Sequence, residues 1–358
     1  MGSVITGTGM FVPDRKVTNE DLSRVMDTDP EWIERRTGVQ TRYFASPGTG
    51  PSDLAVAAGT EALADAGITA ADVDVLITAT MTPDSFAPGI APLVQTKMGL
   101  GPIPAHDIRQ QCSGFLYGLD LADALLDAGK AETVLVVGAE VHAGYQPWVE
   151  SWPYLLGQSD TPPTAEQYDR NTRFRAWSVL FGDGAGAAVL RRSQAPNGGI
   201  LASRLSTDGS HFDLIHVPAP GFVRQPYLTQ EIIDADLHMP TMKGRELFRQ
   251  AVTLMPAAVR AVLDDVDLTV ADLDVVVAHQ ANARIVDAAR KQLGLDADIV
   301  PINIDRYGNT TAATLPILYD ELRRAGRVPP GALVAFTAFG AGAHWGAILY
   351  REPMATPA

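Results

Sequence analysis

A short internal repeat constrains the fold of this chain more than any other feature. Residues 68–75 read Ile-Thr-Ala-Ala-Asp-Val-Asp-Val and residues 268–275 read Leu-Thr-Val-Ala-Asp-Leu-Asp-Val, so Asp272 stands 200 positions after Asp72. Each copy follows a helical segment and leads into a strand rich in β-branched residues, and this shared context favours duplication over a chance match. The sequence therefore predicts an α/β protein of two related halves, in which helices cover sheets.

The repeat also divides the chain. We expect an N-terminal half over residues 1–190, a connecting segment over 191–240 and a C-terminal half over 241–358. Within the first half, residues 144–174 are rich in Pro, Trp, Tyr and Gln and predict a long irregular loop. Long loops inside compact domains are uncommon and often serve as lids or interfaces.

A glycine-rich stretch follows this loop. Residues 182–186 read Gly-Asp-Gly-Ala-Gly, between two expected strands at 177–181 and 187–190. A phosphate-binding loop would lead into a helix, whereas here a strand follows, so the pattern predicts a tight hairpin instead.

Composition excludes several classes of protein. Apolar residues make up 46% and charged residues 20% of the chain, as in a well-packed globular protein. No apolar run is long enough to cross a bilayer, and the start lacks a signal-peptide pattern, so we expect a cytoplasmic protein without membrane contact. The net charge of −14 argues against binding to nucleic acid, and an acidic partner would need a local basic patch. CxxC and HExxH spacings are missing, so we expect no metal.

Cys112 is the only cysteine. A short strand is expected at 103–108, and Phe115, Leu119, Ala122 and Leu126 follow the cysteine at helical spacing. A cysteine at the N-terminus of a helix lies near free amide donors and the positive end of the dipole, which favours the nucleophilic thiolate. The alternative is that Cys112 is a small buried hydrophobic residue, as lone cysteines often are.

Two polar residues of the second half stand at equivalent places. His279 follows the strand expected at 273–277, and Asn309 precedes the helix expected at 312–324. Ligand sites in α/β sheets gather at the carboxyl ends of strands, so Cys112, His279 and Asn309 are expected to meet in one crevice. These groups suit acyl transfer to a thiolate, with two neutral donors for a thioester oxygen that becomes an enolate on decarboxylation. Each residue could instead have a structural role, the histidine in the core and the asparagine in a turn.

Several motifs in order along the chain resemble the β-ketoacyl-acyl-carrier-protein synthase III family of the thiolase superfamily. They comprise Gly7-Thr-Gly9, Asp27-Thr28, Glu31-Trp-Ile-Glu-Arg-Arg-Thr-Gly38, Cys112-Ser-Gly-Phe115, Phe181-Gly-Asp-Gly-Ala-Gly186, His279-Gln-Ala-Asn282, Gly308-Asn-Thr310, Phe339-Gly-Ala-Gly342 and Trp345-Gly346. The resemblance implies a homodimer with a five-layered αβαβα fold. It also implies that an acyl-CoA primer acylates the cysteine, and that malonyl-loaded acyl carrier protein is then condensed with loss of carbon dioxide, without a cofactor beyond the thioesters.

The resemblance also implies roles for individual residues. Cys112 would be the acylated nucleophile, and His279 and Asn309 would assist decarboxylation. The amides of Cys112 and Ala341 would form an oxyanion hole, with Phe339 near the thiol.

Substrate contacts are implied in the same way. Trp32 and Arg175 would enclose the adenine of coenzyme A, beside Thr28 and Arg36. The pantetheine tunnel would be lined by Gly244, Phe248 and Asn282. The basic patch that docks the carrier protein would be formed by Arg249, Arg284 and Lys291.

The chain departs from the family pattern in three places. Ala341 stands where the family has glycine, although its amide is retained. Ala87 stands where relatives place a large residue that caps the acyl pocket across the dimer, and Phe86 is its neighbour. The segment 144–174 is longer than in the housekeeping enzyme. The last two departures lead us to expect a primer longer than acetyl.

Two other functions compete with this prediction. The first is a related acyltransferase or head-to-head acyl-CoA condensing enzyme of specialised metabolism. Asn309 favours decarboxylating condensation, since simple transfer needs no enolate. The second is a non-catalytic acyl-CoA-binding scaffold, which would usually have lost one of the three catalytic residues.

Overall fold

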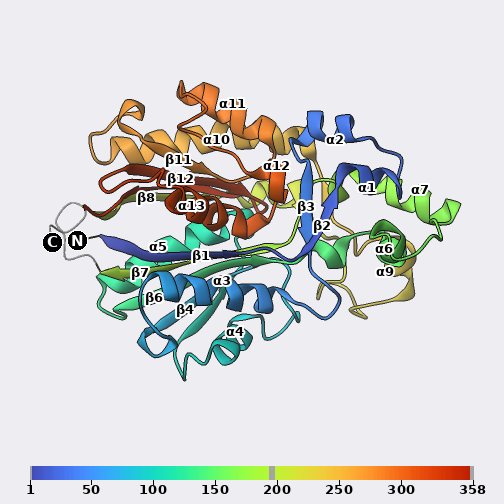
Figure 1. Cartoon of the computed structure of the whole chain (residues 1–358), viewed down its shortest axis with the longest axis horizontal. Coiled ribbons are helices and arrows are strands. Elements are labelled where there is room, and N and C mark those ends of the chain that lie inside the picture. Colours follow the sequence, from blue (N-terminus) through green and yellow to red (C-terminus); the bar gives the residue numbers. More distant parts are fainter. Residues whose placement is uncertain (1, 193–197, 355–358) are drawn as a thin grey trace.

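The computed structural model describes residues 2–192 and 198–354 and contains two stacked mixed sheets (Figure 1). The first sheet has the order β1-β7-β6-β4-β5 and the second β11-β12-β13-β8. The strands of the first sheet are β1 (Ser3–Phe11), β4 (Val75–Ala79), β5 (Ala105–Ile108), β6 (Thr133–Glu140) and β7 (Gly184–Arg192). Those of the second are β8 (Gly199–Thr207), β11 (Val275–Ala278), β12 (Leu333–Gly340) and β13 (His344–Arg351).

Helices fill the space between the sheets and cover both outer faces. In Figure 1, α5 (Gly114–Asp127) and α13 (Thr314–Arg324) lie between the sheets, while α3 (Pro51–Asp65) and α4 (Ala91–Met98) cover the first sheet. The outer face of the second sheet is covered by α10 (Gly244–Asp264) and α11 (Ala283–Leu293). This arrangement confirms the five αβαβα layers.

The central layer contains a large buried apolar cluster. Leu116, Leu119 and Leu126 of α5 and Leu315 and Leu322 of α13 pack in one buried cluster with side chains of both sheets. A helix that is buried on several sides needs apolar residues around most of its surface, which explains the apolar content of α5, whereas α13 also carries the charged residues Asp320, Glu321, Arg323 and Arg324 in its C-terminal part. The two helix N-termini are thereby fixed in the centre of the molecule.

The offset of 200 residues extends well beyond the repeat visible in the sequence. Residues 133–140 form β6 and residues 333–340 form β12, and the turns at 111–113 and 311–313 each lead into a central helix. Thr69 and Asp72 form a capping box that Thr269 and Asp272 repeat. In addition, β8 lies within the expected connecting segment 191–240 and forms an outer strand of the second sheet. The boundaries of the two halves stay a prediction.

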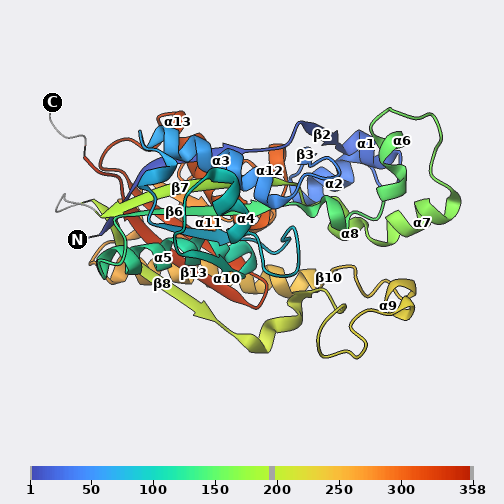
Figure 2. The ribbon, with the colours of Figure 1, turned by 90° about the horizontal axis from the view of Figure 1, so that it is seen from below.

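The segment 144–174 is not the irregular loop that the sequence predicts. It contains α6 (Trp152–Leu155) and α7 (Ala165–Arg173) and lies with α1 (Asn19–Ser23) and α2 (Pro30–Thr37) at one end of the molecule (Figure 2). Trp148 is buried against Val17, Leu22 and Phe44 in a cluster of its own. Short helices broken by Pro residues carry little periodic signal, and burial of the tryptophan orders the segment.

The prediction of a strand at residues 177–181 and of a tight hairpin at residues 182–186 is also wrong. Residues 175–178 form a short helix, α8 (Arg175–Ser178), and the rings of Trp177 and Phe181 stack with centroids 3.9 Å apart. The following strand, β7, pairs antiparallel with β1 on one side and β6 on the other, so the glycine stretch leads into a central strand.

The remaining elements surround one end of the sheets. They are β2 (Arg15–Thr18), α1 (Asn19–Ser23), α2 (Pro30–Thr37), β3 (Thr41–Phe44), β9 (Ile215–His216), α9 (Gln230–Asp234), β10 (Thr241–Met242) and α12 (Ile304–Tyr307). Asp29 caps α2 by accepting the amide of Trp32 at 2.7 Å, which places Trp32 in the first turn. A helix long and apolar enough to span a membrane is not found within 2–192 or 198–354.

Candidate active site

Cys112 lies in a tight turn between β5 and α5. Residues 111–113 form one 3₁₀ turn, and α5 begins at Gly114. Gln111, the residue before the cysteine, has a φ of +50°, which is unusual for a residue with a side chain. Cys112 in this turn is buried, with 7% of its surface exposed.

The thiol is not prepared as a thiolate in the way that its helix position predicts. Burial, and then the nearby Glu140 carboxylate, raise the pKa of Cys112 to about 12, although the amides of Cys112 and Ala341 donate hydrogen bonds that oppose this rise. Desolvation of the anion therefore outweighs the helix terminus. The amides of Cys112 and Ala341 share the space at the sulfur, which is the arrangement expected of an oxyanion hole.

His279 follows β11 and is buried to 1% exposure. Its backbone amide donates to the carbonyl of Thr337 at 2.9 Å, and its Nδ1 lies 2.7 Å from the Thr314 hydroxyl. Nε2 is buried without a hydrogen-bond partner among the described residues. Burial lowers the pKa of His279 to about 3, so the ring is neutral near pH 7 and one nitrogen is free for a ligand.

Asn309 is fixed by its backbone and by its own side chain. Its amide donates to Leu180 O at 2.9 Å, its carbonyl accepts from Gly182, and it pairs with Phe181 in an isolated parallel bridge. The side-chain Oδ1 accepts the amide of Thr311 at 2.8 Å. Because Oδ1 is held in this way, the amide nitrogen Nδ2 is directed elsewhere as a donor.

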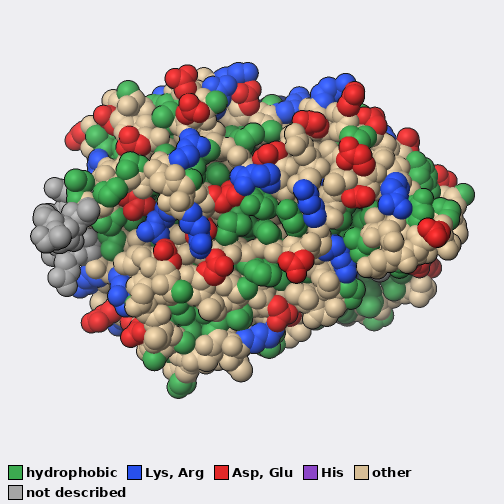
Figure 3. Space-filling view, in the orientation of Figure 1, with side chains coloured by type: hydrophobic (Ala, Val, Ile, Leu, Met, Phe, Trp, Pro, Cys, Tyr) green, Lys and Arg blue, Asp and Glu red, His purple; other side chains and the backbone are tan. Residues whose placement is uncertain are grey.

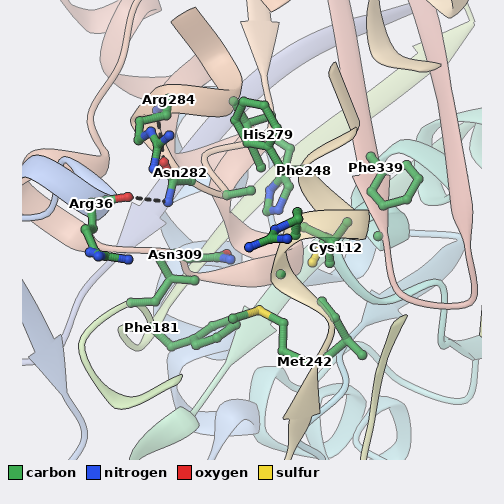
Figure 4. Close-up of a pocket in the computed structure, with 18 residues that line it drawn as sticks. Arg36, Cys112, Phe181, Met242, Phe248, His279, Asn282, Arg284, Asn309 and Phe339 are labelled. Atoms are coloured by element: carbon green, nitrogen blue, oxygen red, sulfur yellow. Dashed lines mark hydrogen bonds between the residues drawn. The ribbon is translucent and has the colours of Figure 1, made fainter. Parts of the chain in front are cut away.

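One cavity of about 460 Å³ brings these three residues together. Figure 4 shows Cys112, His279 and Asn309 around the same space, although they come from distant parts of the chain. Phe339 lines the same cavity. Further residues that no sequence pattern pointed to also line the cavity, namely Leu180, Ile215, Met242, Arg245, Leu247 and Ile285.

The pantetheine residues expected from the resemblance line this cavity as well. Gly244, Phe248 and Asn282 do so, together with Arg36 and Arg284. Asn282 also caps α11 by accepting the amide of Arg284, and its Nδ2 donates to the carbonyl of Arg36 at 2.9 Å (Figure 4). The asparagine thus links α11 to α2 beside the cavity.

The residues expected to hold adenine gather around Trp32. The guanidinium carbons of Arg36 and Arg175 lie 4.9 Å and 4.8 Å from the ring centroid of Trp32. Arg175 is also 3.7 Å from the carboxylate of Asp27. The hydroxyl oxygen of Thr28 is buried without a partner among the described residues.

The three expected docking residues lie on α10 and α11. Arg249, Arg284 and Lys291 are exposed, and the guanidinium of Arg284 lies 5.8 Å from the Phe248 ring centroid. Lys291 pairs with Asp287 at 2.7 Å. On the face drawn in Figure 3, basic and acidic side chains are interspersed. Arg284 lines the cavity of about 460 Å³, whereas Arg249 and Lys291 do not line it.

A second cavity, of about 600 Å³, also reaches Cys112. Its lining includes Ala341 and several aromatic residues: Phe86, Tyr145, Trp177, Phe181, Phe212 and Tyr227. Polar side chains line it as well, namely Arg109, Gln111, His216 and His344. The described residues include no group of three or more His, Cys, Asp or Glu that could hold a metal ion.

Comparison with known proteins agrees with this geometry. The model of the 3-oxoacyl-[acyl-carrier-protein (ACP)] synthase III family matches residues 106–151 and 164–209, and that of its C-terminal region matches 263–352. The chain is 40% identical to beta-ketoacyl-[acyl-carrier-protein] synthase III of Rhizorhabdus wittichii over 98% of this chain and 99% of the relative. It is 41% identical to beta-ketoacyl-[acyl-carrier-protein] synthase III 3 of Streptomyces coelicolor, covering 99% and 98%.

A solved structure shares the whole architecture. The 3-oxoacyl-(acyl carrier protein) synthase III of Pseudomonas aeruginosa superposes with a TM-score of 0.84 at 35% identity, covering all of both chains. The family match, the sequence identity and the shared fold lead to one conclusion. The chain belongs to the 3-oxoacyl-[acyl-carrier-protein] synthase III family and is a condensing enzyme of the ketosynthase and acyltransferase class.

Proposed function

We propose that this enzyme transfers an acyl group from acyl-CoA to Cys112 and then condenses it with malonyl-loaded acyl carrier protein. The observation that carries this proposal is the single cavity lined by Cys112, His279 and Asn309. The reaction needs no cofactor other than its thioester substrates.

In the first step the Cys112 sulfur attacks the thioester carbonyl of acyl-CoA. The new carbon–sulfur bond forms as the bond to coenzyme A breaks, and the thiol proton leaves with the coenzyme A sulfur. The amides of Cys112 and Ala341 stabilise the oxyanion of the tetrahedral intermediate. Because the free thiol has a raised pKa, proton removal and attack are coupled.

In the second step the malonyl thioester loses carbon dioxide and leaves an enolate. His279 Nε2 and Asn309 Nδ2 donate hydrogen bonds to the enolate oxygen, and the neutral state of His279 suits donation without transfer of its proton. The carbon nucleophile attacks the acyl carbonyl on Cys112, and the cysteine sulfur departs. The product is a β-ketoacyl thioester on the carrier protein.

We further propose a primer longer than acetyl. The second cavity extends from Cys112 into an aromatic lining, and its volume of about 600 Å³ exceeds what a two-carbon group fills. Phe86 lines this cavity and remains 59% exposed, so it can narrow the pocket where Ala87 cannot.

Recognition of the substrates follows from the basic groups around the first cavity. Trp32, Arg36, Arg175 and Thr28 would hold the nucleotide of coenzyme A, while Gly244, Phe248 and Asn282 would line the pantetheine path. Arg249, Arg284 and Lys291 would receive the acidic carrier protein, because long-range attraction between opposite charges guides such encounters.

We propose that the enzyme is a cytoplasmic homodimer. Among the described strands, β5 is at the edge of the first sheet and pairs with β4 alone. An uncovered edge strand is a template for pairing with another chain. Pairing with a second copy would also bring exposed Phe86 close to the partner.

The test combines two measurements on the full chain. Intact mass spectrometry with a panel of acyl-CoA lengths should show one acyl adduct, lost in Cys112→Ala, with longer chains preferred over acetyl. Malonyl-loaded carrier protein should then release carbon dioxide and yield a β-ketoacyl product. An acyl adduct without carbon dioxide release would instead favour the acyltransferase alternative, and a strong acetyl preference would refute the longer primer.

A further inference from the structure

Thr311 makes hydrogen bonds toward both donors of the proposed condensation step, although it does not line the catalytic cavity. It is fully buried in the turn before α13. Its amide donates to Asn309 Oδ1 at 2.8 Å, and its carbonyl accepts the hydroxyl of Thr314 at 3.1 Å. That hydroxyl lies 2.7 Å from Nδ1 of His279. Thr311 therefore stands between the side chains of Asn309 and His279.

The backbone of Thr311 is strained. Its φ is +50°, and a β-branched residue with positive φ is a conformational outlier. Such a conformation persists only where surrounding contacts fix it, and outliers of this kind cluster at functional sites. The contacts that hold Thr311 are thus part of what positions its neighbours.

His142 supplies the side-chain contact. Its Nε2 lies 2.9 Å from the Thr311 hydroxyl, and its Nδ1 lies 3.0 Å from the carbonyl of Gly182. A carbonyl can only accept, so Nδ1 carries the proton and Nε2 accepts from Thr311. The ring is fully buried and stacks on Phe181 at 4.7 Å between centroids. His142 therefore fixes the hydroxyl of Thr311 from the N-terminal half of the chain.

We propose that His142 and Thr311 are positioning residues. They hold the side chains of Asn309 and His279 where both can donate hydrogen bonds to the enolate oxygen. The inference rests on the proposed function. Neither residue touches the cavity, and both act through the side chains that do. Cys112 and its oxyanion amides have no hydrogen bond to this network among the described residues, so we expect changes in the network to affect acylation of the cysteine less than decarboxylation.

Thr314 completes the arrangement on the His279 side. Its single hydroxyl proton can reach either Nδ1 of His279 or the carbonyl of Thr311. When the proton is given to Nδ1, Nε2 must carry the histidine proton and becomes the donor that the enolate needs. In that state the Thr311 carbonyl, 3.1 Å from the Thr314 hydroxyl, is a packing neighbour and not an acceptor, so it limits where the hydroxyl can lie by contact alone.

The experiment separates the two half-reactions. Single-turnover acylation by acyl-CoA is followed by intact mass, and carbon dioxide release from malonyl-loaded carrier protein is measured on the acylated enzyme. Removing one oxyanion donor outright costs about 100- to 1000-fold, so misplacing donors should cost about 10- to 100-fold. We expect Thr311→Val and His142→Leu to lower carbon dioxide release by that factor while acylation changes by less than about threefold.

Conservative variants provide the rescue. Thr311→Ser keeps the hydroxyl and His142→Gln keeps an acceptor, so both should recover most of the decarboxylation rate. Thr310→Val is the matched control, because this neighbouring buried threonine has no side-chain hydrogen bond among the described residues.

Three outcomes would overturn the inference. Loss of both half-reactions together with a lower melting temperature would give the network a structural role only. Unchanged carbon dioxide release would give it no role in positioning. An equal effect of Thr310→Val would remove its specificity. Failure of the proposed function is recognised separately, because the wild-type enzyme would then form no acyl adduct or release no carbon dioxide.

Discussion

The two halves of the molecule build the same turn before their central helices. In the N-terminal half, Gln111 has a φ of +50° and begins a 3₁₀ turn, and α5 starts at Gly114. In the C-terminal half, Thr311 has the same φ and begins an equivalent turn, and α13 starts at Thr314. The side chains in these equivalent places differ. The first turn presents Cys112 where the second has Ala312, and His279 follows β11 at the position that Ala79, the last residue of β4, occupies in the first half. The same backbone conformation therefore presents the nucleophile in the N-terminal half and the hydrogen-bond donors in the C-terminal half.

The two turns also pack across the midline of the molecule. A Cβ built on Gly138 of β6 would clash with the backbone of Ala312, and one built on Gly340 of β12 would lie 2.9 Å from the amide nitrogen of Cys112. Each half thus fixes the turn of the other. The site therefore depends on packing between the two halves, even though the residues of each turn are close together in sequence.

The largest effects should come from removing the functional side chains of one half at a time. Cys112→Ala should abolish the acyl adduct and all product formation. His279→Ala and Asn309→Ala should each lower carbon dioxide release by about 100- to 1000-fold while the cysteine is still acylated. Intact mass and carbon dioxide release measure the two steps. Loss of acylation in the second-half variants would contradict the division of roles.

A smaller effect is expected from filling the close contacts between the halves. Overpacking a tight core typically costs about 1–3 kcal/mol, and we expect Gly138→Ala to cost more than Gly340→Ala, because its Cβ would meet a carbonyl oxygen more closely. Denaturant unfolding measures the cost. Gly340→Ala should also slow acylation, whereas Gly138→Ala should slow decarboxylation. Identical functional effects would show that the turns are not positioned separately.

The pH dependence of the free energy of unfolding should report the contribution of His142, the buried histidine of the first half. Burial lowers the pKa of His142 to about 4, below the ordinary value of 6.5, so its contribution is complete above pH 6.5 and is lost as pH falls toward 4. Relative to His142→Gln, the free energy of unfolding of the wild type should fall by about 1 kcal/mol as the pH is lowered from 6 to 5.

Unfolding of both proteins across this range provides the measurement. Asp183 and Glu140 have a raised pKa, to about 7 and about 8, because they are buried, but they are present in both proteins and their effects cancel in the comparison. A difference that is independent of pH would show that His142 is not buried in its neutral form.

The smallest effect concerns the repeat itself. Thr69 and Asp72 form a capping box with a hydroxyl–carboxylate distance of 2.8 Å, and Thr269 and Asp272 form its counterpart at 2.7 Å. Thr69→Ala and Thr269→Ala should each lower the melting temperature by about 1–3 °C, and by similar amounts. Unequal shifts would show that one copy has become the more important for the fold.

Local patterns in the sequence determined much of this protein. The repeat at residues 68–75 and 268–275 established the duplicated α/β plan, and apolar spacing after Cys112 established the central helix, because periodicity reports which faces are buried. Polar residues at strand ends predicted His279 as a site residue and the turn before a helix predicted Asn309, and both line the cavity of about 460 Å³. The motifs, taken together, identified the family.

Tertiary structure alone decided the rest. Trp148 has no periodic partners in sequence, and it orders the segment 144–174 because Val17, Leu22 and Phe44 come from far away to bury it. The raised pKa of Cys112 likewise depends on burial, which a helix N-terminus in the sequence does not report. His142 and Thr311 are 169 positions apart, and their hydrogen bond exists only because the two halves pack together. A sequence pattern records local periodicity, whereas desolvation and long-range hydrogen bonds arise when distant segments meet.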